Sequence, residues 1–161
     1  MARNEADRED LMAEATALRQ RVELQLPGES EPVVAGIRDL GRWSVYFGPD
    51  PVYGFDAEGG LRRAYVGGFL YRSQQATLSR LKRVRTETTS ELHRYDLTPA
   101  ELQAFLRDMT LRLASFQSAL QSGDFEVRQQ IPADRNLVPD LLAALQVVLN
   151  APHIAAPLKR A

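Results

Sequence analysis

Aromatic and arginine side chains are concentrated in one stretch of the chain, and together they suit the binding of single-stranded nucleic acid. Eight of the twelve aromatic residues lie between positions 43 and 71, and Arg62, Arg63 and Arg72 lie among or directly after them. Aromatic rings stack on bases and guanidinium groups neutralise phosphates, so an exposed sheet that carries both can hold an unpaired strand. Aromatic residues also pack well inside sheets, and arginine is common on the solvated side of a sheet. The alternative to nucleic acid binding is therefore that these aromatic and arginine residues have a purely structural role.

Strand alternation predicts which of these side chains share a face. Leu61, Arg63 and Tyr65 are expected on one face of their strand, and on the following strand Arg72 is expected opposite Tyr71. Charge adds to the pattern, since residues 61–94 hold eight bases and two acids, a net charge of +6. The predicted binding surface consists of nine residues: Arg62, Arg63, Tyr65, Tyr71, Arg72, Arg80, Lys82, Arg83 and Arg85.

The remaining chemistry-bearing residues predict no catalytic site, no cofactor and no metal site. The chain has no cysteine, which excludes disulfides, thiolate nucleophiles and sulfur-ligated zinc. His93 lies two residues from Glu91 on one expected strand face, which suits a surface pair. Asp50, Asp56 and Glu58 fall in two turns, where aspartate caps backbone N–H groups, although acids in turns can also bind Mg²⁺.

Paired glycines at 59–60 and 67–68 do not form a phosphate-binding loop. A Walker loop needs Lys and Ser or Thr after the glycines at the start of a helix, whereas Leu-Arg-Arg and Phe-Leu-Tyr follow here. The glycines instead predict hairpin turns, because glycine accepts the positive φ that such turns require.

Apolar periodicity predicts helices at both ends of the chain and strands between them. Residues 5–19 and 137–149 carry helical apolar stripes, and 78–84 suits a strand or a helical turn, with a strand favoured by its neighbours. Thr98-Pro99-Ala100-Glu101 is a capping box with proline in the first turn, and it starts a long helix that Gly123 ends.

This order of elements predicts an α+β fold. We expect a curved, meander-like antiparallel sheet of about six to eight strands, with an N-terminal helix and two C-terminal helices packed on it. Residues 1–150 are expected to form a single domain and residues 151–161 a loose tail. The charged N-terminus is unlike a secretory signal, and the sequence contains no long apolar run, so no membrane association and a cytoplasmic location are expected.

One segment carries a family resemblance. It reads Phe47-Gly-Pro-Asp-Pro-Val-Tyr-Gly-Phe-Asp-Ala-Glu-Gly-Gly-Leu-Arg-Arg-Ala-Tyr65 and continues to Phe69-Leu-Tyr-Arg72. It resembles an uncharacterised family of hypothetical proteins from planctomycete-type bacteria, and the resemblance extends from the first helix into the helix after Thr98. That family has no assigned activity, cofactor or partner, so the resemblance implies none for this chain.

Three functional hypotheses follow from these patterns. The first is a non-catalytic binding module that takes nucleic acid on the arginine and aromatic hairpin surface. The second is a protein-interaction or self-assembly module, in which the acidic residues 1–31, with a net charge of −4, pair with the basic block. The third is a small-molecule binder or enzyme that uses the acids at positions 50–58.

Overall fold

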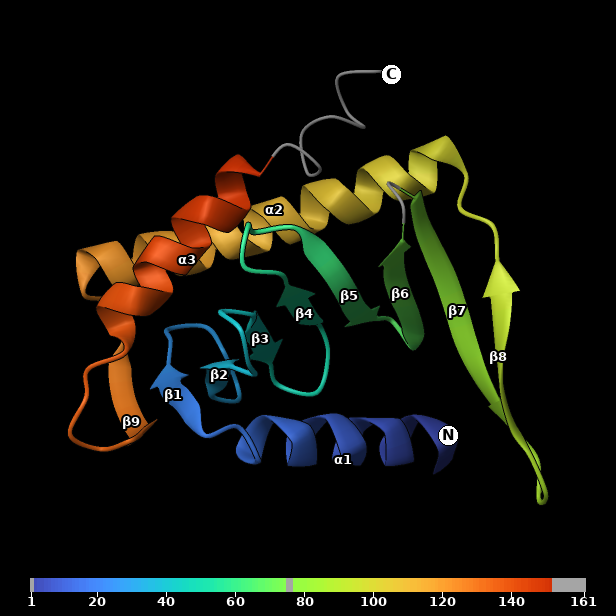
Figure 1. Cartoon of the computed structure of the whole chain (residues 1–161), viewed down its shortest axis with the longest axis horizontal. Helices are drawn as coiled ribbons and strands as arrows, with labels where there is room; N and C mark the ends of the chain where they lie inside the picture. The colour runs from blue at the N-terminus through green and yellow to red at the C-terminus, as the bar shows by residue number, and fades with distance from the viewer. Residues whose placement is uncertain (1, 75–76, 152–161) are drawn as a thin grey trace.

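The computed structural model describes residues 2–74 and 77–151, which form an α+β structure around one open antiparallel sheet (Figure 1). The helices are α1 (Ala2–Thr16), α2 (Pro99–Ser122) and α3 (Val138–Asn150). The strands are β1 (Gln20–Gln25), β2 (Val33–Ile37), β3 (Trp43–Phe47), β4 (Val52–Phe55), β5 (Leu61–Val66), β6 (Phe69–Gln74), β7 (Thr77–Arg85), β8 (Ser90–Tyr95) and β9 (Glu126–Ile131). The predicted fold class is confirmed, and the described residues contain nine strands, slightly more than predicted.

The sheet is a meander with one added edge strand. Its strand order is β8-β7-β6-β5-β4-β3-β2-β1-β9, so each of β1 to β8 pairs with its neighbour in sequence, and β9 returns after α2 to pair with β1. Glycine permits the tight connection between β5 and β6, because Gly67 and Gly68 have φ values of 61° and 84°. The paired glycines at 67–68 therefore form a hairpin turn, as predicted.

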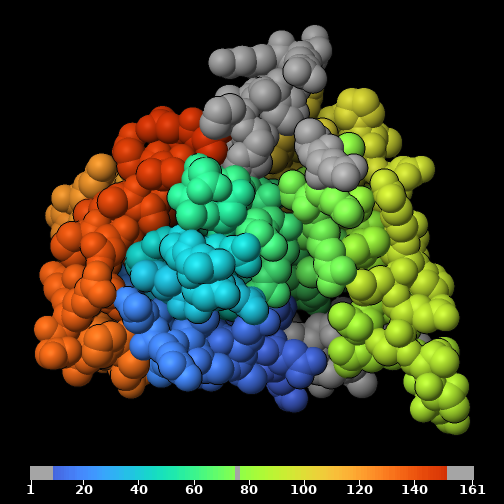
Figure 2. All heavy atoms as spheres, viewed as in Figure 1, coloured from blue at the N-terminus to red at the C-terminus, as the bar shows by residue number. Residues whose placement is uncertain are grey.

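Two predicted boundaries are corrected or resolved by the structure. The first helix spans Ala2–Thr16 instead of residues 5–19, since the chain turns at Ala17 and enters β1. The ambiguous segment at 78–84 belongs to β7, which pairs along its length with β6 and β8. The tip of the β7–β8 hairpin projects from the body of the molecule in the space-filling view (Figure 2).

Helices α2 and α3 cover one face of the sheet, and this contact forms the main core (Figure 1). The predicted capping box is present, with Thr98 Oγ1 accepting from Glu101 N and Glu101 accepting from Thr98 N. Gly123 ends α2 in the left-handed region with φ 78°. The buried stripe of α2 comprises Phe105, Leu106, Met109, Leu113, Phe116 and Leu120.

Helix α1 lies on the opposite face, where it covers only part of the sheet (Figure 1). Ala15 and Leu18 pack there with Val34, Tyr46 and Tyr65 in a smaller apolar cluster. Along the described chain no other helix lies on this side, so basic side chains of β5 to β7 remain accessible beside α1. We call this side of the sheet the α1 face and the other the α2 face.

The end of the described chain is better packed than the sequence indicates. Ala151 was assigned to the loose tail, yet it is buried in the main core directly after α3. The rest of the predicted tail, residues 152–161, lies outside the described residues. In residues 2–74 and 77–151, the structure contains no helix of sufficient length and apolarity to cross a membrane.

Candidate anion-binding groove

A β-bulge in β5 determines which side chains reach the α1 face. Leu61 pairs with Phe55 and Arg63 pairs with Gly54, so Arg62 is an extra residue on β5. The bulge breaks simple alternation. Leu61 is buried in the main core on the α2 face, whereas Arg63 extends over the α1 face. The prediction that these two residues share a face is therefore wrong.

A row of small and basic residues crosses the α1 face. These residues occupy matching register positions on six consecutive strands, and in order they are Gly36, Ser44, Gly54, Arg63, Arg72 and Ser79. Gly54 is tightly surrounded, since a Cβ atom there would lie 3.2 Å from Arg63 Cγ and 3.5 Å from Ser44 Oγ. The small residues of this row leave the sheet surface uncovered by large side chains, and Arg63 and Arg72 extend from it.

Two hollows that share Arg63 as a lining residue lie along this row. The first, of about 190 Å³, is lined by Arg38, Arg42, Ser44, Gly54, Phe55, Arg62 and Arg63. The second, of about 390 Å³, is lined by Asp10, Leu11, Glu14, Arg63, Tyr65, Gly68, Leu70, Arg72, Arg83, Arg85 and Leu92. Arg63 belongs to both. We call the two hollows the first pocket and the second pocket, and together they form the arginine groove.

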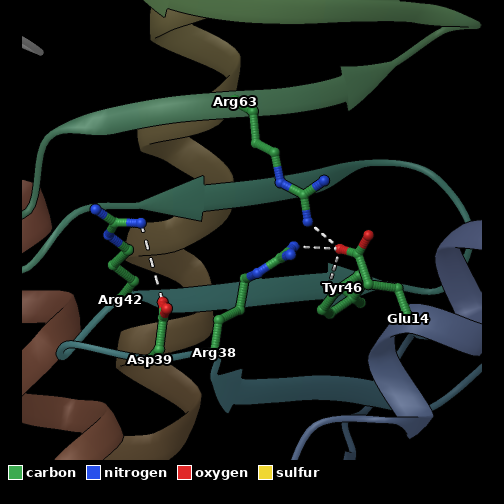
Figure 3. A network of polar contacts seen from close by, with 6 residues as sticks. All are labelled: Glu14, Arg38, Asp39, Arg42, Tyr46 and Arg63. Atoms are coloured by element: carbon green, nitrogen blue, oxygen red, sulfur yellow. Dashed lines mark hydrogen bonds and ion pairs between the residues drawn. The ribbon is translucent and has the colours of Figure 1, made fainter.

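Glu14 of α1 lies at the junction of the two pockets and holds two of the arginines (Figure 3). Its Oε1 atom accepts hydrogen bonds from Arg63, from Arg38 at 2.7 Å and from the Tyr46 hydroxyl at 2.8 Å. Partial burial alone would raise the pKa of Glu14, but Arg63, Tyr46 and Arg38 together hold it below its ordinary value. The carboxylate is therefore charged at neutral pH.

The same contacts affect Tyr46 and place the acidic helix against the basic block. Burial, followed by the nearby Glu14 carboxylate, raises the pKa of Tyr46 to about 12. Asp10 lies 3.8 Å from Arg85 at the other end of the groove. Asp10 and Glu14 of the acidic N-terminal segment thus contact Arg85 and Arg63 of the basic block within this chain.

The nine residues predicted as a binding surface do not form one surface. Six of them line the arginine groove: five arginines, Arg62, Arg63, Arg72, Arg83 and Arg85, and Tyr65. Tyr65 also belongs to the α1 face, but only 7% of it is exposed beneath α1. The other three, Tyr71, Arg80 and Lys82, lie on the α2 face, because neighbouring residues of a strand point to opposite sides.

Residues on the α2 face have structural contacts instead. Tyr71 stacks on Phe105 of α2 with ring centroids 4.3 Å apart, and it is 8% exposed. Arg80 donates to Glu101 at 2.7 Å and lies over the Phe69 ring, which Lys82 also contacts. Both tyrosines of the predicted surface are therefore buried, so they cannot stack on bases in this structure.

Sequence reasoning missed four contributors to the groove: Glu14, Arg38, Arg42 and Ser44. They come from α1, from the turn between β2 and β3, and from β3, all outside the basic block at 61–94. Glu14 and Arg38 are 24 residues apart, and no local spacing pattern links them. The net charge of +6 in residues 61–94 was the only signal of a basic site in the sequence, and these residues form only one side of the groove.

The acids and histidine that were considered for catalysis have local structural contacts. Asp56 Oδ1 accepts from Gly60 N at 2.7 Å and from Glu58 N at 3.0 Å, as expected for a turn residue. Asp50 accepts from Gly67 N at 2.9 Å. His93 is 3.3 Å from Glu91 on the exposed strand β8. In the part of the chain that the structure describes, no three His, Asp or Glu side chains are grouped to hold a metal ion.

Comparison with known proteins adds no relative. No family model matches the chain, and neither the curated proteins nor the solved structures contain a significant match. Function is therefore argued from the site alone.

Proposed function

We propose that this protein is a non-catalytic binding module that holds a phosphate-rich polymer, with nucleic acid as the ligand, in the arginine groove. One observation carries the proposal: the groove gathers many arginines and few acids on one face. The arginines are Arg38, Arg42, Arg62, Arg63, Arg72, Arg83 and Arg85, and the lining carboxylates are Asp10 and Glu14.

Arginine is well suited to bind phosphate. Its planar guanidinium presents five N–H donors that match two phosphate oxygens at once. Arg62 and Arg72 are exposed, and neither makes a hydrogen bond or ion pair with another described residue. Their donors are directed to no protein acceptor in this part of the chain, so they are available to a ligand.

The groove suits the sugar–phosphate backbone better than the bases. The first pocket is lined by Ser44 and Gly54 beside its arginines, and the tyrosines Tyr46 and Tyr65 are buried under α1. With no exposed ring among the described groove residues, contact is made mainly through charge. We therefore expect little sequence preference and a strong dependence of affinity on salt.

Fluorescence anisotropy of labelled single-stranded DNA, single-stranded RNA and duplex DNA over a salt series tests this proposal. If four groove arginines each neutralise one phosphate of a single strand, the slope of log K against log[salt] is about −3. Arg72→Ala should weaken binding roughly fivefold or more and make the slope shallower by about 0.7.

Lys82→Ala is the matched control, because it also removes one positive charge from the basic block but on the α2 face. It should leave affinity within about twofold of wild type and the slope unchanged. Absence of binding to all three nucleic acids at low salt, or equal losses in the Arg72 and Lys82 variants, would contradict the proposal.

A protein partner is the second candidate, and one observation favours it. The carboxylates of α1 already contact the groove through Glu14 and Asp10, so an acidic helix fits there chemically. A poly-glutamate peptide that displaces labelled DNA at equal charge concentration would support this candidate. Displacement by polyphosphate alone would favour nucleic acid.

A further inference from the structure

Ser44 has a buried side-chain hydroxyl with no hydrogen-bond partner among the described residues. Only 1% of the residue is exposed, its Oγ atom is buried, and the residue is one of those that line the first pocket. Buried hydroxyl groups nearly always have a partner, because an unmet hydrogen bond destabilises the fold. An unpartnered hydroxyl at the base of an arginine-lined pocket therefore indicates a polar group that binds there.

The neighbours of Ser44 place guanidinium groups close to it. Ser44 pairs with Gly54 of β4, and the Arg63 side chain lies over Gly54, with Nε 3.4 Å from the place where a Cβ atom would be. Arg38, Arg42, Arg62 and Arg63 line the same pocket. The pocket combines a hydroxyl, which can donate one hydrogen bond, with guanidinium groups, which have donors and no acceptor, and this set suits an anion.

The volume of the first pocket limits the size of its ligand. Pockets for whole drug-sized molecules or cofactors measure roughly 300–1,000 Å³. At about 190 Å³ the first pocket is smaller, so it accommodates one anionic group and not a nucleotide. The second pocket is larger, at about 390 Å³, and shares Arg63 with the first, so it has room for the adjoining part of a ligand.

Glu14 fixes the orientation of two of the pocket's arginines without closing the pocket. Arg38 and Arg63 extend toward it from the sheet, while Arg42 lies apart from the Glu14 cluster, close to Asp39 (Figure 3). Glu14 lines the second pocket and not the first. Each guanidinium has five donors, so the contact with Glu14 leaves others for a ligand.

We propose that the first pocket binds the terminal phosphate of a nucleic acid strand whose backbone continues along the second pocket. This inference rests on the proposed function and names the part of the ligand that the first pocket recognises. A terminal phosphomonoester carries up to two negative charges and three free oxygens, whereas an internal phosphodiester carries one charge and two. The small, donor-rich pocket favours the terminal group.

The test compares three labelled single-stranded DNA decamers that are identical except for a 5′-phosphate, a 3′-phosphate or no terminal phosphate. Wild type should bind one phosphorylated form about tenfold more tightly than the unphosphorylated form. Ser44→Ala should weaken binding of the phosphorylated decamer more than binding of the unphosphorylated one, and so reduce that preference to about threefold or less. Arg42 lines only the first pocket, and Arg42→Ala should reduce the preference in the same way.

Inorganic phosphate alone provides an independent readout, through the thermal stability of the protein. Phosphate should raise the Tm of wild type more than sulfate does, and it should have a smaller effect on Ser44→Ala. Equal affinity of wild type for all three decamers would overturn the inference and leave the proposed function intact. Failure of every decamer to bind would remove the proposed function, and an absent phosphate effect on Tm would then remove the pocket as well.

Discussion

Replacing Glu14 with Gln should destabilise the protein and at the same time tighten its binding to nucleic acid. One carboxylate oxygen accepts hydrogen bonds from Arg63, Arg38 and Tyr46, and this carboxylate also lines the groove. Glutamine preserves the shape and one acceptor oxygen but removes the charge. The two effects have opposite signs because the same charge stabilises the fold and repels the ligand.

The stability loss follows from the three contacts. A hydrogen bond to a charged group contributes about 1.5–3 kcal/mol and a neutral one about half as much, so each contact loses roughly 0.5–1 kcal/mol. Arg38 is about two-fifths exposed, which lowers its share. The sum is about 1–2 kcal/mol, equivalent to a fall in Tm of about 3–6 °C for a chain of this length.

The loss should also depend on pH in a defined direction. The folded pKa of Glu14 is lowered from its ordinary value of 4.5, so the stabilisation is present above pH 4.5 and is lost as pH falls through the folded value. Thermal melts of wild type and Glu14→Gln should therefore differ at pH 7 and converge in acid.

The affinity gain follows from one removed charge. Removal of a like charge at a partly exposed site favours an anionic ligand by about 0.5–1 kcal/mol, or roughly two- to fivefold in affinity at low salt. The gain should fade above about 0.5 M salt, where screening is strong. Anisotropy with labelled single-stranded DNA measures it.

Glu101→Gln is the control for this prediction. It makes the same substitution in a carboxylate that binds Arg80 on the other side of the sheet and completes the α2 capping box. It should lower Tm without tightening nucleic acid binding. A Glu14→Gln variant that loses both stability and affinity, or a Glu101→Gln variant that binds equally tightly, would refute the reasoning.

Two further predictions concern the scaffold. Thr98→Ala removes the capping hydroxyl of α2 and should lower the free energy of unfolding by about 1 kcal/mol, which is about 2–4 °C in Tm. Nucleic acid affinity should not change. A loss of affinity would show that the groove depends on this helix end. Burial raises the pKa of both Tyr46 and Tyr53 to about 12, above the value near 10 of an unfolded chain, so stability should be full below pH 10 and fall as pH approaches 12. Absorbance at 295 nm should show two tyrosines still protonated at pH 11, and titration of all five near pH 10 would contradict this.

Local signals in the sequence predicted most of the fold. The capping box at Thr98 and the closing glycine at Gly123 determine both ends of α2, and hairpin glycines mark the turn between β5 and β6. These features depend on residues within a few positions of one another. Strand β7 remained ambiguous because its register is set by pairing with β6 and β8, which no short window contains.

The candidate site was harder to predict because it depends on strand register and on contacts distant in sequence. The bulge at Arg62 shifts the alternation of β5, so Leu61 and Arg63 face opposite sides. A count of charges in sequence also cannot separate Arg72, which lines the groove, from Arg80, which binds Glu101. Ser44 is recognised as a pocket residue only when the strand pairing places Gly54 and Arg63 beside it.

The most direct test of the central claim is to observe which arginines contact nucleic acid. Each arginine has a side-chain Nε–Hε group that NMR can resolve, and single Arg→Lys variants assign the signals. During titration with an unlabelled single-stranded DNA decamer at low salt, the signals of Arg62, Arg63 and Arg72 should shift, while Arg80 and Arg112 on the α2 face should not. Shifts confined to Arg80 and Arg112, or no shift at saturating DNA, would contradict the assignment of the arginine groove as the binding site.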